Sequence, residues 1–523
     1  MIFIMSSAYC SSDFELEFGK IIPSFLPLGN KRLYEYQANL FKEIKDRIVL
    51  TIPQSFNISK YDLAKINILN IELLKVPDGL SLGEALVYSI NMYSPLNEIL
   101  YILHGDAYFD YLDLDENLLT LAKTKENYKW AYFFDRYNTN YETKNKIQPD
   151  DKLILSGFMS IRNPYFLVKC ILKNKYSFIE GLKEYSKVHL FEISMNKSWR
   201  DFGLITSYFY NRKIISTQRS FNDLEFCDNG YIVKTSSWNN KIKAEINWYK
   251  NFPKELDIYI PKFQLNDEKS YKIEYLYNNT LSELFVFGNL PYYVWENIFI
   301  SLDIFLNKIH YFKNKLDKDI TFNCINKTVN RLKLLQYQHN DLWQGVDLIN
   351  QEYSFNKQKP ISLQVILNEI NPYLTSISSQ YCVIHGDFCF SNIMFDFRSG
   401  IIKTFDPRGM DFKEKITIYG DKDYDYAKLI HCVFGMYDFI ISEFYTCKIS
   451  NDEIYLDFYT NDEITKIQDK FLDIFKLNKK TFAITIHLFL SMLPLHNDNK
   501  NRQKAFFANI FRLYFLFKDK GLI

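Results

Sequence analysis

Three polar residues in the second half of the chain have the types and spacing that phosphoryl transfer requires. The sequence HGDFCFSN begins at His385 and contains Asp387 and Asn392, and Asp406 follows in the sequence FDP, nineteen residues after Asp387. Phosphoryl transfer needs a carboxylate that positions the attacking hydroxyl and accepts its proton, and oxygen ligands that hold magnesium against the nucleotide phosphates. We therefore predict that Asp387 is the catalytic carboxylate and that Asn392 and Asp406 are magnesium ligands.

The H-G-D-x-x-x-x-N pattern resembles that of the aminoglycoside phosphotransferase and choline kinase family. The resemblance covers about residues 219–523 and implies a protein-kinase-like fold that phosphorylates small molecules with ATP. Residues 424–427, Tyr-Asp-Tyr-Ala, resemble the family's segment after the metal-binding aspartate. We assign Asp425 a structural role in bracing the loop, and we expect His385 to fix the loop and not to contact substrate.

The same resemblance implies a small amino-terminal lobe that clamps the nucleotide. The strand-like sequence YIVK ends at Lys234, which is expected to contact the α- and β-phosphates. Glu245, eleven residues later in a helical segment, is its expected ion-pair partner. Residues 216–222 are the expected phosphate-covering turn, and Glu274 and Leu276 belong to the expected hinge that meets adenine through its backbone.

The first two hundred residues resemble sugar nucleotidyltransferases in four short motifs that occur in the family's order. The motifs are PLGNKRLYEYQ from Pro27 to Gln37, GLSLG from Gly79 to Gly83, ILHGD ending at Asp106, and WRDFG around Asp201. The resemblance implies that Asp106 and Asp201 hold a second magnesium ion. It also implies in-line attack of a sugar or alcohol phosphate on the α-phosphorus of a nucleoside triphosphate, with pyrophosphate leaving.

Two loops in this part depart from the family's pattern. The family's first loop is Gly-x-Gly, whose backbone N–H groups cradle phosphates, whereas this chain has Ser-Ser-Ala-Tyr. We place Ser7 and Ala8 of that loop at the nucleotide. The family's catalytic Pro-Lys is replaced by Pro-Ser, with Ser24 in place of the lysine. Lys20 and Lys31 are then the candidate catalytic lysines, with helix capping as the alternative role for Lys31.

Apolar periodicity predicts the fold class. Strand-like runs at 2–5, 48–52, 71–76 and 98–103 alternate with helical patterns at 33–45 and 82–92. This alternation predicts a largely parallel sheet covered by helices over residues 1–212, an α/β domain of the Rossmann-like GT-A type. An α+β protein-kinase-like domain is expected to follow, with an antiparallel N-lobe at about 213–280 and a mostly helical C-lobe at about 281–523.

The amino-acid composition indicates which binding partners and which cellular compartment to expect. Lys plus Arg (63) nearly balances Asp plus Glu (62), so the net charge of +1 gives no electrostatic footprint for nucleic acid or an anionic membrane. The eight cysteines form no CxxC pair, which fits a reducing cytosol better than a disulfide framework or a zinc site. The most apolar late stretch, 481–495, is too short to span a bilayer. We expect a cytoplasmic protein that binds nucleotides and a small alcohol, amino alcohol or sugar.

Three functions remain open at this point. The first is a bifunctional enzyme that phosphorylates a small alcohol or sugar with ATP and Mg²⁺ and activates the phosphate with a second nucleoside triphosphate. By family analogy, such products supply surface polysaccharide biosynthesis. The second is a kinase whose first domain has lost catalysis, which the missing Gly-x-Gly loop favours. The third is a non-catalytic nucleotide-binding platform, against which the set of Asp387, Asn392 and Asp406 argues.

Overall fold

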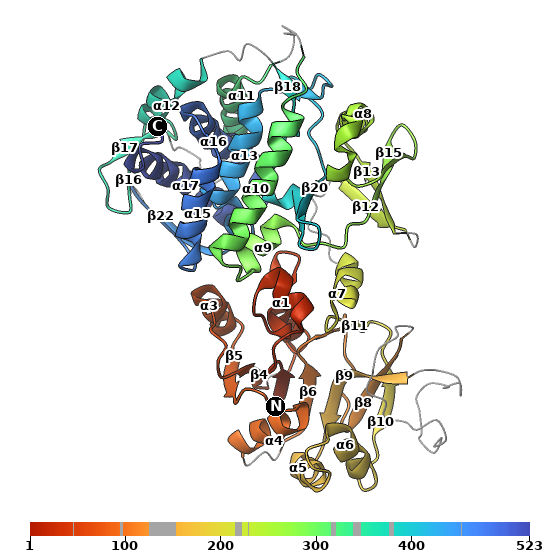
Figure 1. Cartoon of the computed structure of the whole chain (residues 1–523). Helices are drawn as coiled ribbons and strands as arrows, with labels where there is room; N and C mark the ends of the chain where they lie inside the picture. The colour runs from red at the N-terminus through yellow and green to blue at the C-terminus, as the bar shows by residue number, and fades with distance from the viewer. Residues whose placement is uncertain are drawn as a thin grey trace. The chain divides into compact units, whose positions relative to one another are not determined.

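The chain divides into two compact units, Met1–Ser216 and Thr217–Ile523. A computed structural model describes all residues except 45, 95–97, 125–152, 215–221, 228–229, 315–320, 338–346, 376–380 and 451. The first unit is an α/β domain and the second an α+β domain (Figure 1). The fold class predicted from the sequence is therefore the one observed, with the division at 216/217 where the sequence suggested 212/213.

A seven-stranded sheet with the order β10-β8-β9-β6-β1-β4-β5 forms the centre of the first unit. Its strands are β1 (Ile2–Met5), β4 (Ile48–Pro53), β5 (Ile71–Val76), β6 (Leu100–His104), β8 (Leu118–Lys123), β9 (Leu153–Ile161) and β10 (Glu192–Met195). β1 pairs in parallel with β4 and β6, and β4 pairs in parallel with β5, as the strand–helix alternation predicts. β9 runs antiparallel between β6 and β8, so the sheet is mixed.

Helices bury the apolar side chains of this sheet. The helices α4 (Leu82–Met92), α5 (Pro164–Lys173) and α6 (Phe178–Ser186) share one core with the strands, and Figure 1 shows them close together beside the sheet. Outside that core, Phe14 of α1 (Ser12–Phe18) packs against Tyr208 of α7 (Ile205–Asn211).

The helix predicted for residues 33–45 is shorter than expected. The helix α2 is Leu33–Asn39, and α3 follows later at Lys60–Ile68. After Asn39 the backbone bonds change to a spacing of three residues, from Phe41 N–H to the Ala38 carbonyl and from Lys42 N–H to the Asn39 carbonyl. Tight turns of this kind commonly end helices.

The second unit begins with a four-stranded antiparallel sheet of order β12-β13-β15-β14. Its elements are β12 (Asn222–Phe226), β13 (Tyr231–Ser236), β14 (Phe263–Leu265) and β15 (Ser270–Glu274), with α8 (Asn239–Asn251) following β13. These elements match the antiparallel lobe predicted from the sequence. The predicted phosphate-covering turn, apart from residue 222, lies outside the described residues.

A mostly helical lobe follows. Its helices are α9 (Leu281–Phe287), α10 (Tyr292–Ile309), α11 (Cys324–Tyr337), α12 (Leu363–Ile370), α13 (Lys422–Val433), α14 (Tyr437–Ile441), α15 (Glu463–Ile474), α16 (Lys479–Met492) and α17 (Lys500–Asp519). The short strands β18 (Cys382–Val383) and β19 (Ile393–Asp396) flank the HGDFCFSN segment, and β20 (Ile401–Thr404) follows and pairs with β19. Two rigid strands therefore fix both ends of that segment.

The lobe predicted to be mostly helical also contains a small sheet. β22 (Tyr445–Ser450) and β23 (Glu453–Phe458) form an antiparallel hairpin, and β16 (Glu352–Phe355) pairs in parallel with β23. In β23, the buried residues Ile454 and Leu456 alternate with exposed neighbours. This period of two is typical of a strand with one buried face.

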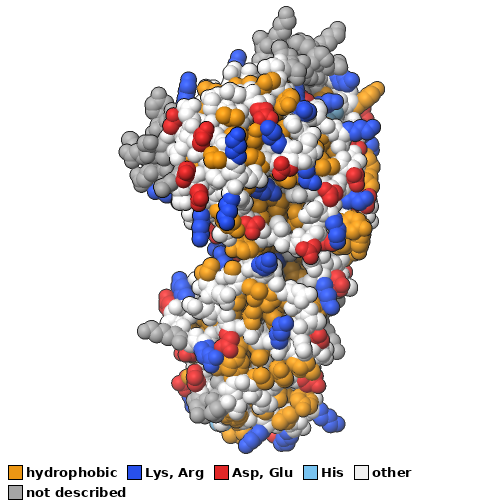
Figure 2. Space-filling model, turned by 90° about the vertical axis from the view of Figure 1, so that its left-hand side faces the viewer, with side chains coloured by type: hydrophobic (Ala, Val, Ile, Leu, Met, Phe, Trp, Pro, Cys, Tyr) orange, Lys and Arg blue, Asp and Glu red, His pale blue; other side chains and the backbone are white. Residues whose placement is uncertain are grey.

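Charged side chains of both signs are interspersed on the surface. On the face drawn in Figure 2, Lys and Arg lie among Asp and Glu on both units. No broad single-sign patch of the kind that attracts nucleic acid is visible there. Within the described ranges, no helix combines the length and the apolar character that a membrane span requires.

A buried ion pair in the first unit provides a test of its packing. Arg32 Nε lies 3.2 Å from Asp62 Oδ1, and both side chains are buried. Asp62→Ala removes this carboxylate from the buried Arg32 charge, so we expect the free energy of unfolding of this unit to fall by about 3 kcal/mol. Hydrogen exchange of a β4 peptide, followed by mass spectrometry in mild denaturant, reports on this unit separately.

The matched control is Glu72→Ala, which removes the exposed ion pair with Arg47. Exposed pairs contribute little, so the expected loss is below about 1 kcal/mol. Equal losses in the two variants would contradict a stabilising role for the buried pair.

Candidate functional site

Lys234 joins the small sheet to the helical lobe through two carboxylates. Its Nζ lies 3.0 Å from Glu245 Oε2 on α8 and 2.8 Å from Asp406 Oδ1 after β20. The Tyr271 hydroxyl donates to Glu245 Oε2 at 2.7 Å and fixes that carboxylate. The ion pair expected between Lys234 and Glu245 is thus formed, while its contact with a nucleotide stays a prediction.

The charges in this cluster persist although the groups are buried. Burial lowers the pKa of Lys234, but Asp406 and Glu245 outweigh that effect and raise it above the ordinary value. Burial raises the pKa of Asp406, but Lys234 and Lys241 outweigh it and leave the pKa below the ordinary value. Asp406 is therefore an anion at neutral pH, as a magnesium ligand must be.

Asp425 braces the loop between β18 and β19. Its carboxylate, on α13, accepts the N–H of His385 at 3.0 Å and of Gly386 at 2.8 Å, and it lies 3.2 Å from His310 Nε2. Gly386 has a φ of 75°, and a Cβ atom there would lie 2.8 Å from Arg408 Cβ. Only glycine satisfies both requirements without strain. Asp425 thus has the bracing role that the sequence predicts.

His385 is fully buried, and both of its ring nitrogens are bonded. Nδ1 accepts the Asp387 N–H at 3.3 Å, which leaves Nε2 to donate to the Phe405 carbonyl at 3.0 Å. Burial lowers the pKa of His385 in spite of the neighbouring carboxylates, so the ring is neutral. These bonds fix the loop against the segment that carries Asp406.

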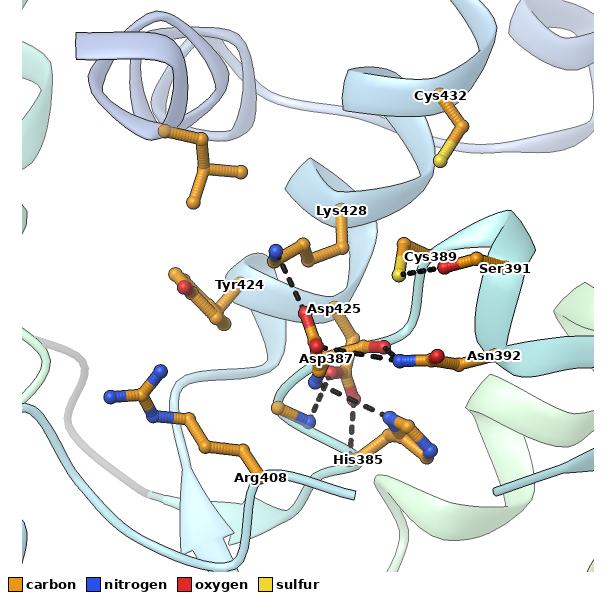
Figure 3. A network of polar contacts seen from close by, with 12 residues as sticks. His385, Asp387, Cys389, Ser391, Asn392, Arg408, Tyr424, Asp425, Lys428 and Cys432 are labelled. Carbon is orange, nitrogen blue, oxygen red and sulfur yellow. Dashed lines mark hydrogen bonds and ion pairs between the residues drawn. The ribbon is translucent and has the colours of Figure 1, made fainter. Parts of the chain in front are cut away.

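Asp387 and Asn392 lie next to each other in the loop (Figure 3). Asn392 Nδ2 donates to the Asp387 carbonyl at 2.9 Å and to its Oδ2 at 3.3 Å, and Lys428 Nζ lies 2.7 Å from Asp387 Oδ1. The Asp387 side chain is 41% exposed, so a substrate can reach it. Asn392 Oδ1 accepts no hydrogen bond from the described residues and is open to a cation.

Asn392 and Asp406 fit the role of magnesium ligands in a nucleotide site. The Asn392 carbonyl accepts the Phe405 N–H at 3.1 Å, which brings Asn392 beside the residue before Asp406. In the described part of the chain, no group of three or more His, Cys, Asp or Glu forms a metal site of its own. Magnesium in such sites uses one or two protein ligands together with phosphate and water oxygens. The pair therefore fits an ion that arrives with the nucleotide.

The expected hinge lies between β15 and α9. Glu274 ends β15, and its carboxylate accepts the Lys262 N–H at 3.3 Å. Leu276 follows the strand, and its backbone N–H and carbonyl make no hydrogen bond with the residues that the structure describes. These free main-chain groups suit an adenine edge, and the assignment stays a prediction.

Sequence reasoning missed three cations near the loop. They are Lys428 on α13, Arg408 in the segment after β20, and Lys327 on α11. Figure 3 shows Arg408, Tyr424 and Lys428 on one side of Asp387. A signal existed for Lys428, because it follows the bracing aspartate by three residues and so shares its side of the helix. Lys327 carries no motif and is distant in sequence.

The first unit brings Asp106 and Asp201 together. Asp106 lies between β6 and β7 (Ala107–Tyr108), and Asp201 ends β11 (Arg200–Asp201), which pairs with β7. Both carboxylates border Gly203: a Cβ atom there would lie 2.6 Å from Asp106 Oδ2 and 3.2 Å from Asp201 Oδ1. The two predicted ligands therefore share one site, while magnesium binding stays a prediction.

The two candidate lysines lie in different places. Lys20 is exposed, and its Nζ lies 4.1 Å from the centre of the Tyr9 ring, beside the loop that contains Ser7 and Ala8. Lys31 belongs to the short strand β3 (Lys31–Arg32).

The alternative role of Lys31 as a helix cap is wrong. Arg32 is the N-cap of α2, and the Arg32 N–H is satisfied by Glu35 Oε1 at 3.0 Å. The catalytic role of Lys31 stays a prediction.

Ser24 is fully buried where the family has its lysine. Its N–H donates to Ser6 Oγ at 3.0 Å, and its hydroxyl donates to the Gly105 carbonyl at 3.2 Å. The serine therefore ties the loop after β1 to the end of β6, next to Asp106. This position supplies no cation to the site.

Comparison with known proteins gives structural neighbours only. No protein-family model matches the chain, and no curated protein matches it. A nucleoside-diphosphate-sugar pyrophosphorylase from Vibrio cholerae RC9 is similar to the amino-terminal part, with 10% identity, 41% of this chain and 100% of that chain covered, and a TM-score of 0.33.

Two further neighbours are similar to the rest of the chain. An aminoglycoside 2'-phosphotransferase in complex with GDP is 12% identical, with 58% of this chain and 92% of that chain covered and a TM-score of 0.35. A choline/ethanolamine kinase family protein from Mesorhizobium loti is 10% identical, with 59% and 95% covered and a TM-score of 0.34. All three belong to the two families that the motifs resemble.

The bracing role of Asp425 can be tested by exchange. Asp425→Ala leaves the N–H groups of His385 and Gly386 without an acceptor, and bonds to a charged acceptor are each worth about 1.5–3 kcal/mol. We expect these amides to exchange at least about tenfold faster in hydrogen-exchange mass spectrometry of the loop peptide. Asp303→Ala is the control, because within the described ranges that carboxylate is bonded to Asn307 alone. Unchanged loop exchange in Asp425→Ala would show that other contacts hold the loop.

Proposed function

We propose that this chain is a bifunctional transferase that phosphorylates a small hydroxyl compound with ATP and then joins the phosphate to a nucleotide. One arrangement carries the kinase half: Lys234 is bonded to both Glu245 and Asp406, and His385 joins the Asp406 segment to the loop of Asp387. A phosphate-clamping cation, oxygen ligands and a hydroxyl-positioning carboxylate are thus held in one framework.

In the proposed kinase reaction, the acceptor oxygen attacks the γ-phosphorus of ATP. The bond from that phosphorus to the β–γ bridging oxygen breaks, and ADP leaves. Asp387 orients the hydroxyl and takes its proton, while Lys234 holds the α- and β-phosphates. Asn392 and Asp406 would hold magnesium, which neutralises charge on the phosphates.

The proposed second reaction belongs to the first unit. The phosphate made by the kinase attacks the α-phosphorus of a second nucleoside triphosphate, and pyrophosphate leaves. Asp106 and Asp201 would hold magnesium there, and Lys20 stands beside the loop of Ser7 and Ala8 that would face the triphosphate. Nucleoside diphosphate conjugates of this kind feed surface polysaccharide biosynthesis, the process that we propose by family analogy.

A kinase with a catalytically silent first unit is the second candidate. The position and bonding of Ser24 favour it, because the buried hydroxyl supplies no charge where the family uses a lysine. The two candidates differ in one product, since only the bifunctional enzyme releases pyrophosphate.

Asp387→Ala tests the kinase reaction. We expect acceptor phosphorylation to fall by about 10³-fold, the usual scale for loss of a positioned acid or base, with ATP binding retained. Mass spectrometry of products from ATP, Mg²⁺ and a panel of alcohols and sugars measures this, with Asp396→Ala as control because that residue ends β19 and lies outside the loop of Asp387. Full activity in Asp387→Ala would remove the residue from the mechanism. ATP binding without transfer in the unaltered protein would favour the non-catalytic platform.

Asp106→Ala tests the second reaction. We expect pyrophosphate release to be abolished while ATP-dependent phosphorylation continues. The reason is that Asp106 lies in the first unit and Asp387 in the second. A pyrophosphate assay with each of CTP, UTP, GTP and dTTP measures it, and Asp110→Ala is the exposed control. Unchanged pyrophosphate release in Asp106→Ala would exclude that residue from the mechanism of the second reaction. No conjugate from the unaltered protein with any nucleotide supports the silent first unit.

A further inference from the structure

Two cations beside the loop of Asp387 have no carboxylate partner among the residues that the structure describes. Lys327 Nζ is bonded to the Tyr424 hydroxyl at 3.1 Å. Arg408 donates only to carbonyls, from Nε to Met410 at 3.0 Å and from a terminal nitrogen to Asp411 at 3.4 Å. Both side chains are partly buried, and neither forms an ion pair with any residue in the described ranges.

The carboxylates of this region are engaged elsewhere. Asp411 accepts the N–H groups of three residues, Thr321, Lys413 and Lys415. Asp421 and Asp423 both pair with Lys480, and Asp425 holds the loop. A partly buried cation without a counter-charge costs free energy. Both cations lie over the Phe412 ring, at 4.3 Å for Lys327 and 5.2 Å for Arg408, and the described residues supply them with no negative charge, which leaves them able to bind an anionic ligand.

The two cations lie within electrostatic range of each other and near the catalytic carboxylate. Burial lowers the pKa of Lys327, and the charge of Arg408 lowers it further. Tyr424, bonded to Lys327, lies one turn before Lys428 on α13, and Lys428 is bonded to Asp387. Figure 3 shows Arg408, Tyr424 and Lys428 on the same side of Asp387. A ligand bound by the two cations can thus present a hydroxyl to that carboxylate.

We propose that Lys327 and Arg408 bind an anionic group of the acceptor, a proposal that rests on the kinase function above. The acceptor is then a hydroxyl compound that carries a carboxylate or a phosphate group, such as a sugar acid or a polyol phosphate. An amino alcohol fits poorly, because its ammonium group would be repelled by the charges of Lys327 and Arg408.

A matched series of acceptors tests the charge preference with the full chain, ATP and Mg²⁺. The series is glycerol, glycerate, glycerol 3-phosphate and 3-amino-1,2-propanediol, and then glucose, glucuronate, glucose 6-phosphate and glucosamine. We expect kcat/KM for the anionic members to exceed that of the neutral and amine members by at least about tenfold, the scale of one hydrogen bond to a charged group. Preference for the amine members overturns the proposal.

Two substitutions test the residues separately. Arg408→Gln and Lys327→Met are each expected to raise KM for the preferred anionic acceptor by at least about tenfold, with KM for ATP unchanged. The controls are Arg398→Gln, in the turn after β19, and Lys333→Met, exposed on α11 with Lys327. A rise in KM for ATP and not for the acceptor assigns the cations to the nucleotide and overturns the proposal.

Equilibrium dialysis separates failure of this proposal from failure of the kinase function. Asp387→Asn protein is dialysed against labelled glycerate, glucuronate and glucosamine, with and without Arg408→Gln. Anion binding that Arg408→Gln weakens, without phosphorylation by the unaltered protein, supports the anion site and overturns the kinase function. Phosphorylation with no preference for anions in turnover or binding overturns the anion site and leaves the kinase function standing.

Discussion

The buried ammonium group of Lys234 is the interaction on which the second unit's site depends. It is bonded to Glu245 on α8 and to Asp406 after β20, so one cation connects three segments. Burying a single charge is costly, and the two carboxylates offset that cost only if both stay in place. Because Lys234 belongs to the small sheet and Asp406 to the helical lobe, the same ion pairs fix the position of the expected metal ligand and the junction of the two lobes.

The loop of Asp387 depends on a second set of contacts. Asp425 holds its backbone, and His385 holds the neighbouring segment. Lys428 holds the Asp387 side chain itself. Side chains on rigid helices thus position a loop that has little secondary structure of its own, which is how a reactive carboxylate keeps its geometry.

Local patterns in the sequence predict part of this site well. The interval from Asp387 to Asn392 and the strand that ends at Lys234 are short-range features, so spacing alone indicates them. The cations Lys327 and Arg408 could not be found in this way, because their importance lies in having no carboxylate partner among the described residues, which only the packed structure shows. The direction of β9 has no local signal either: the strand is buried along its whole length, and burial does not indicate which neighbour it pairs with.

The interval between Asp425 and Lys428 has a consequence for how chains with this helix can diverge. Each residue of an α-helix advances the side-chain direction by about 100°, so one inserted residue would rotate Lys428 away from Asp387 while Asp425 kept its hold on the loop. An insertion in this turn of α13 would therefore separate the contact that holds the Asp387 side chain from the contact that holds its backbone. Helical phase, and not sequence identity alone, limits the evolution of this segment.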